Sequence, residues 1–500
     1  MSDATLVTDR TGVATAEDLS APEPNRNLIR AYWGNFVFAL VLAAVILFTP
    51  DLPDTIVGIL TVLLSIVAMV AGIHVGIAIM GAGAVGLWKL AGTGAVAVTF
   101  EDVPFTAAAS WSLSVIPLFI LMGVTMGRFN LTGKLFSSAQ AWLGRLPGGL
   151  AVSTNFAGAG LAASSGSSIA ISYALGRTTV PEMLRAGYKP SLATGVVAMS
   201  GTLGMLIPPS VILVIYAGVA ETPVGPQLLA ALVPGLLTAL AYGVLIVVRC
   251  SLDPTLGPRS TIRYTWRARF RSLWDVTPVT LILILIIGGM YTGVFTPTEA
   301  GAFGALAAIL LGWLFGDDRS ARHLVRTVLT SLRETAASVA SIFLLLMGVH
   351  VLTRVVALSG VADWITETIS SLGLSRTLFL ICLIFAFLIL GMFMDGLAMI
   401  LLTVPILMPV LSTFDISLLW FGVFMVILVE LALVTPPIGM LSYIIHRIAS
   451  HPEVNRGATI RLSDVFKGVS WFVVTSAVIL VALIFFPDIA LWLPETSAAE

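Results

Sequence analysis

Two Pro-Pro pairs interrupt long apolar stretches of the sequence and free backbone carbonyls that could hold a cation. They stand at residues 208–209 and 436–437, directly after Ile207 and Thr435. Each proline removes a backbone donor and clashes with the preceding helical turn. A carbonyl that is unpaired in hydrocarbon is costly, so it needs a partner. A sodium ion, which takes oxygen ligands, would supply one. The alternative is a proline kink whose carbonyls bond neighbouring groups.

Two other apolar stretches, about 150–181 and about 376–412, are each broken in the middle by small or polar residues. The first break is the Ser-Ser-Gly-Ser-Ser run at 164–168, and the second extends from Gly391 to Gly396. Neither half of either stretch crosses a bilayer easily. The pattern therefore predicts two helical hairpins that each enter and leave on one side. Non-helical backbone at membrane depth is tolerated only where it is buried in protein or lines a wet cavity.

The tips of these hairpins are suited to an anionic substrate. Half-helix N-termini carry partial positive charge and free N–H groups, and serine hydroxyls add ligands. Close packing between small residues is the alternative for the serine run. We expect the substrate to contact these residues: Ser164, Gly166, Ser167, Ser168, Ser210 and Asp395.

Three charged residues inside the apolar stretches are functional candidates, because charge is costly there. Asp395 could help to bind a cation or cap the returning half-helix. Glu430 could be a proton site, an ion-pair partner or an interface residue, and a structural role is favoured because the sequence names no partner. Arg354 could meet an anionic substrate, although an anchor at the membrane interface is favoured.

The composition places most of the chain in lipid. Its 500 residues are 58% hydrophobic and 11% charged, with a mean hydropathy of +1.01, whereas soluble domains average about 25% charged residues. The net charge of -1 argues against a nucleic-acid partner, which needs a basic patch. The two cysteines and the isolated histidines have no metal-ligand spacing. The serine run lacks the base that a hydrolase needs. We expect neither an enzyme nor a bound cofactor.

Apolar runs long enough to span the bilayer as helices recur along the chain. They lie at about 33–49, 55–72, 74–92, 115–130, 191–220, 228–249, 276–293, 297–315, 334–355, 419–446 and 470–487. If the N-terminus is cytoplasmic and successive runs cross the membrane in alternating directions, all but three of the 26 basic residues fall on the cytoplasmic side. The exceptions are Lys89, Arg354 and Arg376. The positive-inside rule therefore supports this topology, which puts the C-terminus in the periplasm.

The two halves of the chain repeat each other weakly and in opposite orientation. Leu-Met-Gly-Val at 121–124 recurs at 346–349, and the two Pro-Pro pairs are separated by nearly the same spacing. Inverted repeats with paired broken helices indicate a secondary transporter whose site lies near the midplane. The predicted fold is an all-α polytopic membrane protein with about 11 transmembrane helices and two re-entrant hairpins. We divide it as follows: a cytoplasmic disordered tail (1–30), an extra transmembrane helix (31–52), the first repeat (53–250), a cytoplasmic basic linker (251–275), the second repeat (276–487) and a periplasmic tail (488–500).

Several ordered motifs together resemble the large membrane subunit of tripartite ATP-independent periplasmic (TRAP) transporters. In the first half these are Pro117 to Gly123, Leu146 to Leu150, the Ser-Gly-Ser tip, Arg185 to Tyr188, and Ile207 to Ser210 followed by Tyr216. In the second half they are Pro297 to Ala300, Gly391 to Asp395, Pro405 to Pro409 and Thr435 to Gly439. The resemblance covers about residues 55–487.

The resemblance implies an elevator-type carrier of the ion-transporter superfamily, driven by sodium and free of other cofactors. It implies a periplasmic substrate-binding protein that delivers a carboxylate such as a C4-dicarboxylate or sialic acid, and a small four-helix membrane subunit. In such carriers each cation lies between a hairpin tip and the following broken helix. Carried over, the first site would involve Ser165, Gly204, Ile207 and Pro209, and the second Gly391, Ala432, Thr435 and Ile438.

Two features depart from the family pattern. The first hairpin usually has an acidic residue a few positions after the Ser-Gly-Ser, where this chain has Ile171. The extra helix at 33–49 is also unusual, and one helix cannot replace a four-helix subunit. The resulting hypothesis is a sodium-coupled, binding-protein-dependent importer of organic acids in the bacterial inner membrane. A stand-alone ion-coupled antiporter or exporter of the same fold is the alternative.

Overall fold

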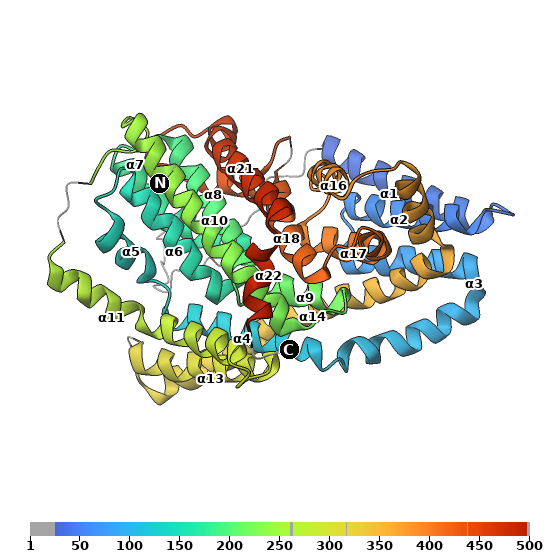
Figure 1. Cartoon of the computed structure of the whole chain (residues 1–500), viewed down its shortest axis with the longest axis horizontal. Helices are drawn as coiled ribbons and strands as arrows, with labels where there is room; N and C mark the ends of the chain where they lie inside the picture. The colour runs from blue at the N-terminus through green and yellow to red at the C-terminus, as the bar shows by residue number, and fades with distance from the viewer. Residues whose placement is uncertain (1–25, 261–263, 317, 438, 498–500) are drawn as a thin grey trace, which may run out of the picture.

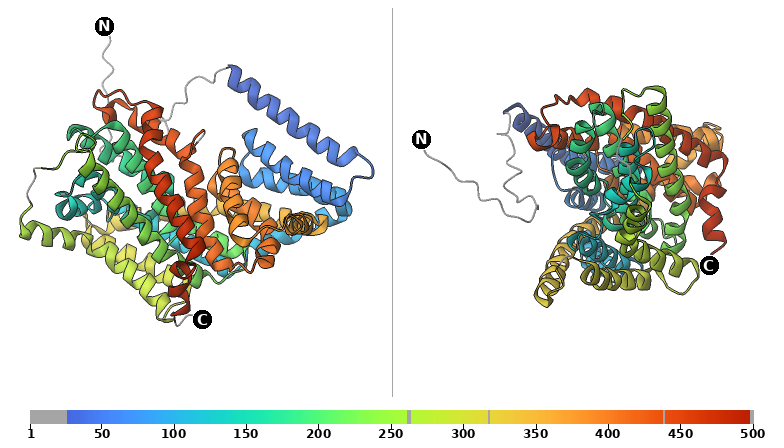
Figure 2. Two further views of the ribbon diagram at one scale, coloured as in Figure 1. Left: turned by 45° about the horizontal axis from the view of Figure 1, so that its top comes forward. Right: turned by 90° about the vertical axis from the view of Figure 1, so that its left-hand side faces the viewer.

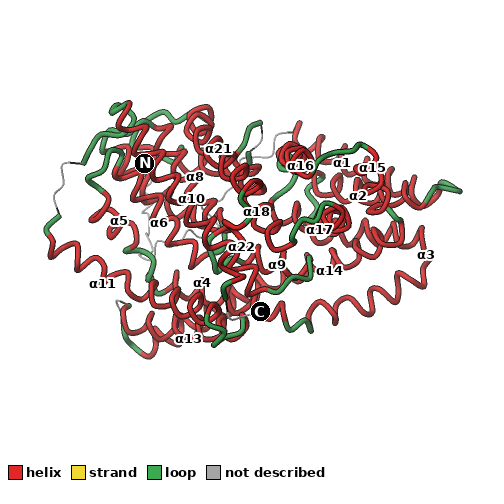
Figure 3. Tube along the Cα trace, viewed as in Figure 1, coloured by secondary structure: helices red, strands yellow, loops and turns green. Residues whose placement is uncertain are grey.

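The computed structural model describes residues 26–260, 264–316, 318–437 and 439–497, and within them the side chains of all residues except 26–32 and 163–165. This described part is built of helices, turns and loops and contains no strand (Figure 3). Seven of its helices are long and apolar enough to cross a membrane, or eight if the bent pair Pro190–Leu206 and Val211–Val219 forms one span. Shorter apolar helices accompany them. The chain is an all-helical polytopic membrane protein, as its composition predicts.

The first half of the chain ends at the long helix α10. Its helices are α1 (Arg26–Phe48), α2 (Asp54–Val70), α3 (Val75–Ala108), α4 (Val115–Arg128), α5 (Leu135–Leu143), α6 (Gly149–Ser165), α7 (Ser168–Arg185), α8 (Pro190–Leu206), α9 (Val211–Val219) and α10 (Val224–Leu252), with a short 3₁₀ turn, η2 (Ser112–Ser114), before α4. Helix α3 continues past the predicted end at residue 92. Gly92 breaks it with a φ of 79°, and the later Glu101 and Asp102 lower the hydropathy on which the prediction depended.

The second half begins after the linker and repeats much of this order. Its helices are α11 (Trp266–Leu283), the π-helical turn η3 (Ile284–Gly288), α12 (Gly289–Tyr291), α13 (Pro297–Phe315), α14 (Ala321–Ser359), α15 (Val361–Ser371), α16 (Arg376–Leu390), α17 (Gly396–Thr413), α18 (Leu418–Val434), α19 (Met440–Ala449), α20 (Pro452–Asn455), α21 (Leu462–Phe485) and α22 (Asp488–Glu495). Helix α14 starts well before the predicted residue 334. Its first turns are amphipathic and carry Arg322, Arg326 and Arg333, so the search for apolar runs did not include them.

The ends of the chain and the linker contain more helix than expected. Residues 26–30 belong to α1, while the rest of the predicted tail, 1–25, lies outside the described residues. Helix α1 packs against α2 and α3 and lies on the outside of the molecule (Figure 2). In the linker, α11 begins at Trp266, and residues 261–263 lie outside the described part. At the C-terminus, α22 packs against α10, and residues 498–500 are not described.

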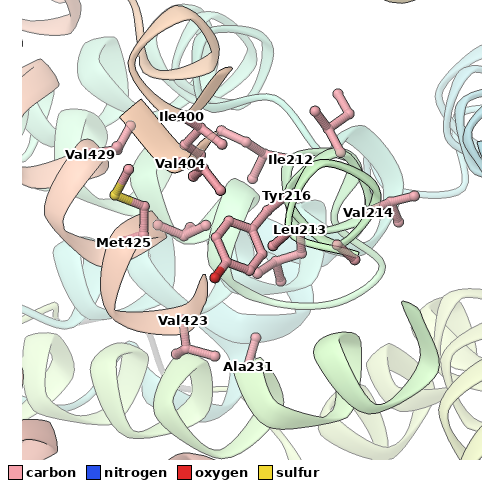
Figure 4. Close-up of a cluster of buried hydrophobic side chains, with 14 of the residues drawn as sticks. Ile212, Leu213, Val214, Tyr216, Ala231, Ile400, Val404, Val423, Met425 and Val429 are labelled. Atoms are coloured by element: carbon pink, nitrogen blue, oxygen red, sulfur yellow. The ribbon is translucent and has the colours of Figure 1, made fainter. Parts of the chain in front are cut away.

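The centre of the molecule is helix α18, which lies between the two hairpins (Figure 1). Every residue from Trp420 to Val434 is buried, because α18 contacts α8, α9, α10, α16, α17 and α21. Figure 4 shows part of this core, where Tyr216 of α9 lies among Val404 of α17 and Met425 of α18. The Tyr216 hydroxyl donates a hydrogen bond to the carbonyl of Leu418 at 2.8 Å. A polar group buried this deeply needs such a partner.

Helices α3, α4 and α14 form a second, elongated group. Helix α14 packs along α3 and also against α4. Near one end, Arg354 donates to the hydroxyl of Thr99 at 2.8 Å and to the carboxylate of Asp102 at 2.5 Å, which ties α14 to α3. Further along α14, Glu334 forms an ion pair with Arg128 of α4. The sequence named no partner for Arg354, and these contacts hold its guanidinium as a link between two helices.

Candidate functional site

The first hairpin is formed by α6 and α7, which are joined at Gly166 and Ser167. Gly166 has a φ of 55°, in the left-handed region that favours glycine. Ser167 is the N-cap of α7, and its Oγ accepts a hydrogen bond from the Ala170 amide at 3.4 Å. The tip therefore presents the N-terminus of α7, whose first amides have no partner within the helix. The side chains of Ser164 and Ser165, both predicted site residues, lie outside the described part.

The first broken helix consists of α8 and α9, which meet at an angle of 46°. Its break, Ile207 to Ser210, is buried. Ser210 is the N-cap of α9: its Oγ accepts from the Leu213 amide at 3.4 Å and donates to the carbonyl of Met205 at 2.5 Å. One carbonyl of the interrupted turn is thus satisfied by a side chain, as the proline-kink alternative requires.

The tip of the first hairpin lies against this break. A Cβ placed on Gly166 would be 3.5 Å from the amide nitrogen of Val211, the first residue of α9. A Cβ on Gly204 would lie 3.6 Å from the carbonyl carbon of Ser167 and would overlap Ile171. The structure therefore brings Gly204 of the predicted first sodium site next to the tip. The N-termini of α7 and α9 meet in the same place.

A cavity of about 430 Å³ opens beside this junction. One wall contains Gly166, Ser167 and Val211, together with residues of α6 and α7. The opposite wall comes from α4 and α14, including Ser338 and Ile342. Its volume lies within the range of small-molecule sites. Two helix N-termini facing a cavity of this size can bind a carboxylate through backbone amides.

Ser168 points away from this cavity and into the protein. It is fully buried, and its Oγ donates a hydrogen bond to Oε1 of Glu430 at 2.7 Å. Glu430 belongs to α18 in the second half and is 5% exposed, and its Oε2 has no hydrogen-bond partner among the described residues. The sequence predicted a structural role for Glu430 without a partner. The partner stands in the serine run 262 residues away, and no local pattern points to the pair.

The second hairpin, α16 and α17, meets the second broken helix, α18 and α19, in the same way. Gly391 lies at the start of the tip, and a Cβ on it would overlap that of Ala432 in α18. Asp395 is the N-cap of α17, with its Oδ1 accepting from the Ala398 amide at 2.9 Å. Of the two roles predicted for Asp395, the capping role is the one formed here.

The second break runs from Thr435 to Gly439, and Ile438 lies outside the described residues. The Thr435 Oγ1 donates to the carbonyl of Leu431 at 2.6 Å, which leaves its oxygen lone pairs free to accept. The Ser442 Oγ donates to the carbonyl of Val434 at 3.0 Å. Oxygen atoms and close backbone approach suit a hard cation such as sodium. Across the described residues, no group of three or more His, Cys, Asp or Glu could hold a transition metal.

Sequence reasoning missed the part of the cavity wall that α14 supplies. Glu334, Ser338 and Ile342 repeat at intervals of four residues and therefore share one face of α14. That spacing could have identified the face. It could not have shown that the face lies opposite the first hairpin, because this depends on long-range packing.

Comparisons with known proteins agree with this architecture. The family model of the tripartite ATP-independent periplasmic transporter DctM component matches residues 62–489. A C4-dicarboxylate TRAP transporter large permease protein of Pseudomonas aeruginosa is 34% identical over 393 residues, which cover 78% of this chain and 88% of that protein. A sialic acid TRAP transporter large permease protein of Vibrio cholerae is 31% identical over 386 residues, covering 77% of this chain and 87% of that protein.

The solved structures add a likeness of fold. The YdaH transporter of Alcanivorax borkumensis superposes with a TM-score of 0.60 at 14% identity, covering 87% of this chain and 98% of that one. At this identity the likeness concerns the fold alone. The match to the family model covers most of the chain and includes both hairpins and both broken helices. The chain therefore belongs to the DctM family of large membrane components of tripartite ATP-independent periplasmic transporters.

Proposed function

We propose that this chain is the transport subunit of a sodium-coupled, binding-protein-dependent importer of small organic acids in the bacterial inner membrane. The observation that carries the proposal is the cavity of about 430 Å³ at the tip of the first hairpin. There the N-termini of α7 and α9 meet, as the contact between Gly166 and Val211 indicates. A carboxylate placed there accepts backbone N–H donors and lies at the positive ends of two helix dipoles.

Sodium ions would bind beside each tip. In the first site, Ser165, Gly204, Ile207 and Pro209 supply oxygens between the hairpin and the break after α8. In the second, Gly391, Ala432, Thr435 and Ile438 do the same beside α18. The close approach of Gly391 to Ala432 and of Gly204 to the first tip supports both placements. Cations here order the tips and offset the charge of the carboxylate, so substrate and sodium bind best together.

Transport follows from the division of the cavity between two groups of helices. The hairpins and broken helices pack on one another around α18, and they would move as one body. Helices α3, α4 and α14 are tied together by Arg354 with Asp102 and Arg128 with Glu334, and they would stay fixed. Movement of the first body past the second carries the substrate across the membrane.

The substrate contacts fall on the residues that line the cavity. Gly166 and Ser167 lie in its wall, whereas Ser210 and Asp395 act as helix caps that hold amide groups in place. Ser168 supports the tip from behind through Glu430. The proposed assembly includes a periplasmic substrate-binding protein and a small four-helix membrane subunit. The N-terminus would face the cytoplasm and the C-terminus the periplasm.

The test is uptake of labelled organic acids by proteoliposomes that contain this chain, its small subunit and its binding protein. We expect uptake to require an inward sodium gradient and to stop when either partner is omitted. Uptake that ignores the binding protein, or that follows a proton gradient instead, would contradict the proposal and support a stand-alone carrier.

A further inference from the structure

The described side chains that line the cavity carry no charge. Among the residues that the structure describes, its lining contains no Lys, Arg, His, Asp or Glu. Ile120 and Val124 of α4 and Ile342 of α14 form much of the fixed wall, and Leu161 and Ile171 belong to the hairpin wall. The only hydroxyl groups among the described lining side chains belong to Thr132, Ser167 and Ser338.

Three of the basic residues close to the cavity along the chain are already paired. Arg128, at the end of α4, is bound to Glu334. Lys134, two residues after Thr132, lies 3.4 Å from Asp275. Arg177 of α7 contacts Glu453 at 3.2 Å and the hydroxyl of Tyr173 at 2.9 Å. None of these three is free to neutralise a second anionic group without giving up its partner. Arg333 of α14 stands five residues before Ser338 and therefore projects from a different face of that helix.

An elevator carrier encloses its substrate during the crossing, so the end of the substrate that faces away from the hairpin tip meets this lining instead of bulk water. A second carboxylate there would be buried without a cation, which is strongly unfavourable. A chain of hydroxyls would outnumber the three hydroxyl side chains, and each hydroxyl that is buried without a partner is unfavourable. An apolar substrate body would gain from burial against Ile120, Ile171 and Ile342.

We propose that the substrate is an organic acid with one carboxylate and a predominantly apolar body, and not a dicarboxylate or a polyhydroxylated acid. This rests on the proposed function of the cavity, and it narrows the substrate class of that site. The carboxylate binds at the N-termini of α7 and α9. The apolar lining accepts the rest of the molecule.

Three acids with six carbons separate the possibilities: hexanoate, adipate and gluconate. Their binding to the purified full chain in lipid nanodiscs, in sodium buffer, can be measured as a concentration-dependent rise in the unfolding temperature. We expect hexanoate to bind at least about tenfold more tightly than adipate or gluconate, the equivalent of roughly 1.4 kcal/mol. Binding of adipate or gluconate as tight as that of hexanoate overturns the inference and leaves the proposed function standing. Failure of all three acids to bind overturns both.

The variant Ser338→Arg provides the internal control. Ser338 is exposed on α14 and lines the cavity, so an arginine there supplies the missing cation at little cost to folding. We expect this variant to strengthen adipate binding about tenfold and to leave hexanoate binding no stronger. Ser338→Gln, similar in length but neutral, should not strengthen adipate binding. An unchanged preference in Ser338→Arg would show that hexanoate binds elsewhere, for example in the lipid, and would also overturn the inference.

Discussion

The Ser168 hydroxyl and the Glu430 carboxylate, 2.7 Å apart and buried, join the first hairpin to the broken helix of the opposite half. Ser168 is the first residue of α7, so the bond acts directly behind the hairpin tip. Glu430 stands one turn before the second break at Thr435. This hydrogen bond therefore offers a physical route for coupling the two proposed cation sites.

Removal of either partner should weaken this link. We expect Ser168→Ala to lower the free energy of unfolding by about 1–3 kcal/mol, because it leaves Oε1 of Glu430 unpaired and buried. Glu430→Gln keeps an acceptor oxygen for Ser168 and should cost less than Glu430→Ala. The free energies of unfolding of Ser168→Ala, Glu430→Ala and the double variant give the coupling energy between the two residues. Additive effects would show that the two residues do not interact.

Gly391 should tolerate no side chain. Its Cβ would overlap that of Ala432, so Gly391→Ala must push the second tip away from α18, at a cost of about 1–3 kcal/mol. We expect uptake to fall at least about tenfold and the sodium requirement to rise. The matched control is Gly81→Ala on α3, where a Cβ meets nothing within 4 Å and alanine is the better helix former. Equal effects of the two substitutions would contradict the account.

The Thr435 hydroxyl is expected to act as a sodium ligand. Thr435→Val keeps the shape of the side chain and removes the oxygen, whereas Thr435→Ser keeps the oxygen. We predict that the sodium concentration for half-maximal uptake rises about tenfold in the valine variant, equivalent to roughly 1.4 kcal/mol, and changes little in the serine variant. An unchanged sodium dependence in Thr435→Val would place the cation elsewhere.

Arg354 should behave as a link between helices and not as a substrate ligand. Its pair with Asp102 is partly exposed, with side chains 39% and 49% accessible, and such solvent-screened pairs contribute little to stability. We expect Arg354→Gln and Asp102→Asn to lower stability slightly and by similar amounts, with the KM for uptake unchanged. A large rise in KM in Arg354→Gln alone would instead assign the guanidinium to the substrate.

The breaks in the apolar pattern were sufficient to predict the helix pairs α6–α7 and α16–α17 and both broken helices, because an interrupted helix in lipid needs a special environment. The prediction that neither half of a pair is long enough to cross a bilayer was wrong for α17, which has the length and hydropathy of a span. The residues at 164–168 and at 391–396 mark turns between helices in the structure. Hydropathy did not predict the full length of helices whose environment changes from one end to the other. Helix α14 starts with three arginines and ends among buried residues, so a hydropathy window recognised only part of it.

The site was harder to predict than the fold. The candidate site consists mainly of backbone groups and helix caps, whose roles depend on geometry more than on residue type. The sequence offered Asp395 as a cation ligand or a helix cap, and only the structure shows its capping contact with the Ala398 amide. The partners of Glu430 and Arg354, and the wall formed by Ser338 and Ile342, come from long-range packing that no spacing in one sequence reveals.

The central claim is that the hairpins move past α4 and α14 across the cavity. Ala174 of α7 and Ser338 of α14 both line that cavity, and both are exposed. With Cys250→Ala and Cys382→Ser removing the native thiols, cysteines at these two positions can be joined by a short reducible cross-linker. The control joins Arg128→Cys to Glu334→Cys, two positions outside the cavity lining whose native side chains form an ion pair between α4 and α14.

Uptake by proteoliposomes that contain the cross-linked protein tests most directly whether the hairpins move past α4 and α14. The account predicts that the cross-link between positions 174 and 338 abolishes uptake and that reduction restores it, whereas the cross-link between 128 and 334 leaves uptake largely intact. Normal uptake with the first cross-link fully formed would contradict the account, because the two walls would then not move relative to each other during transport.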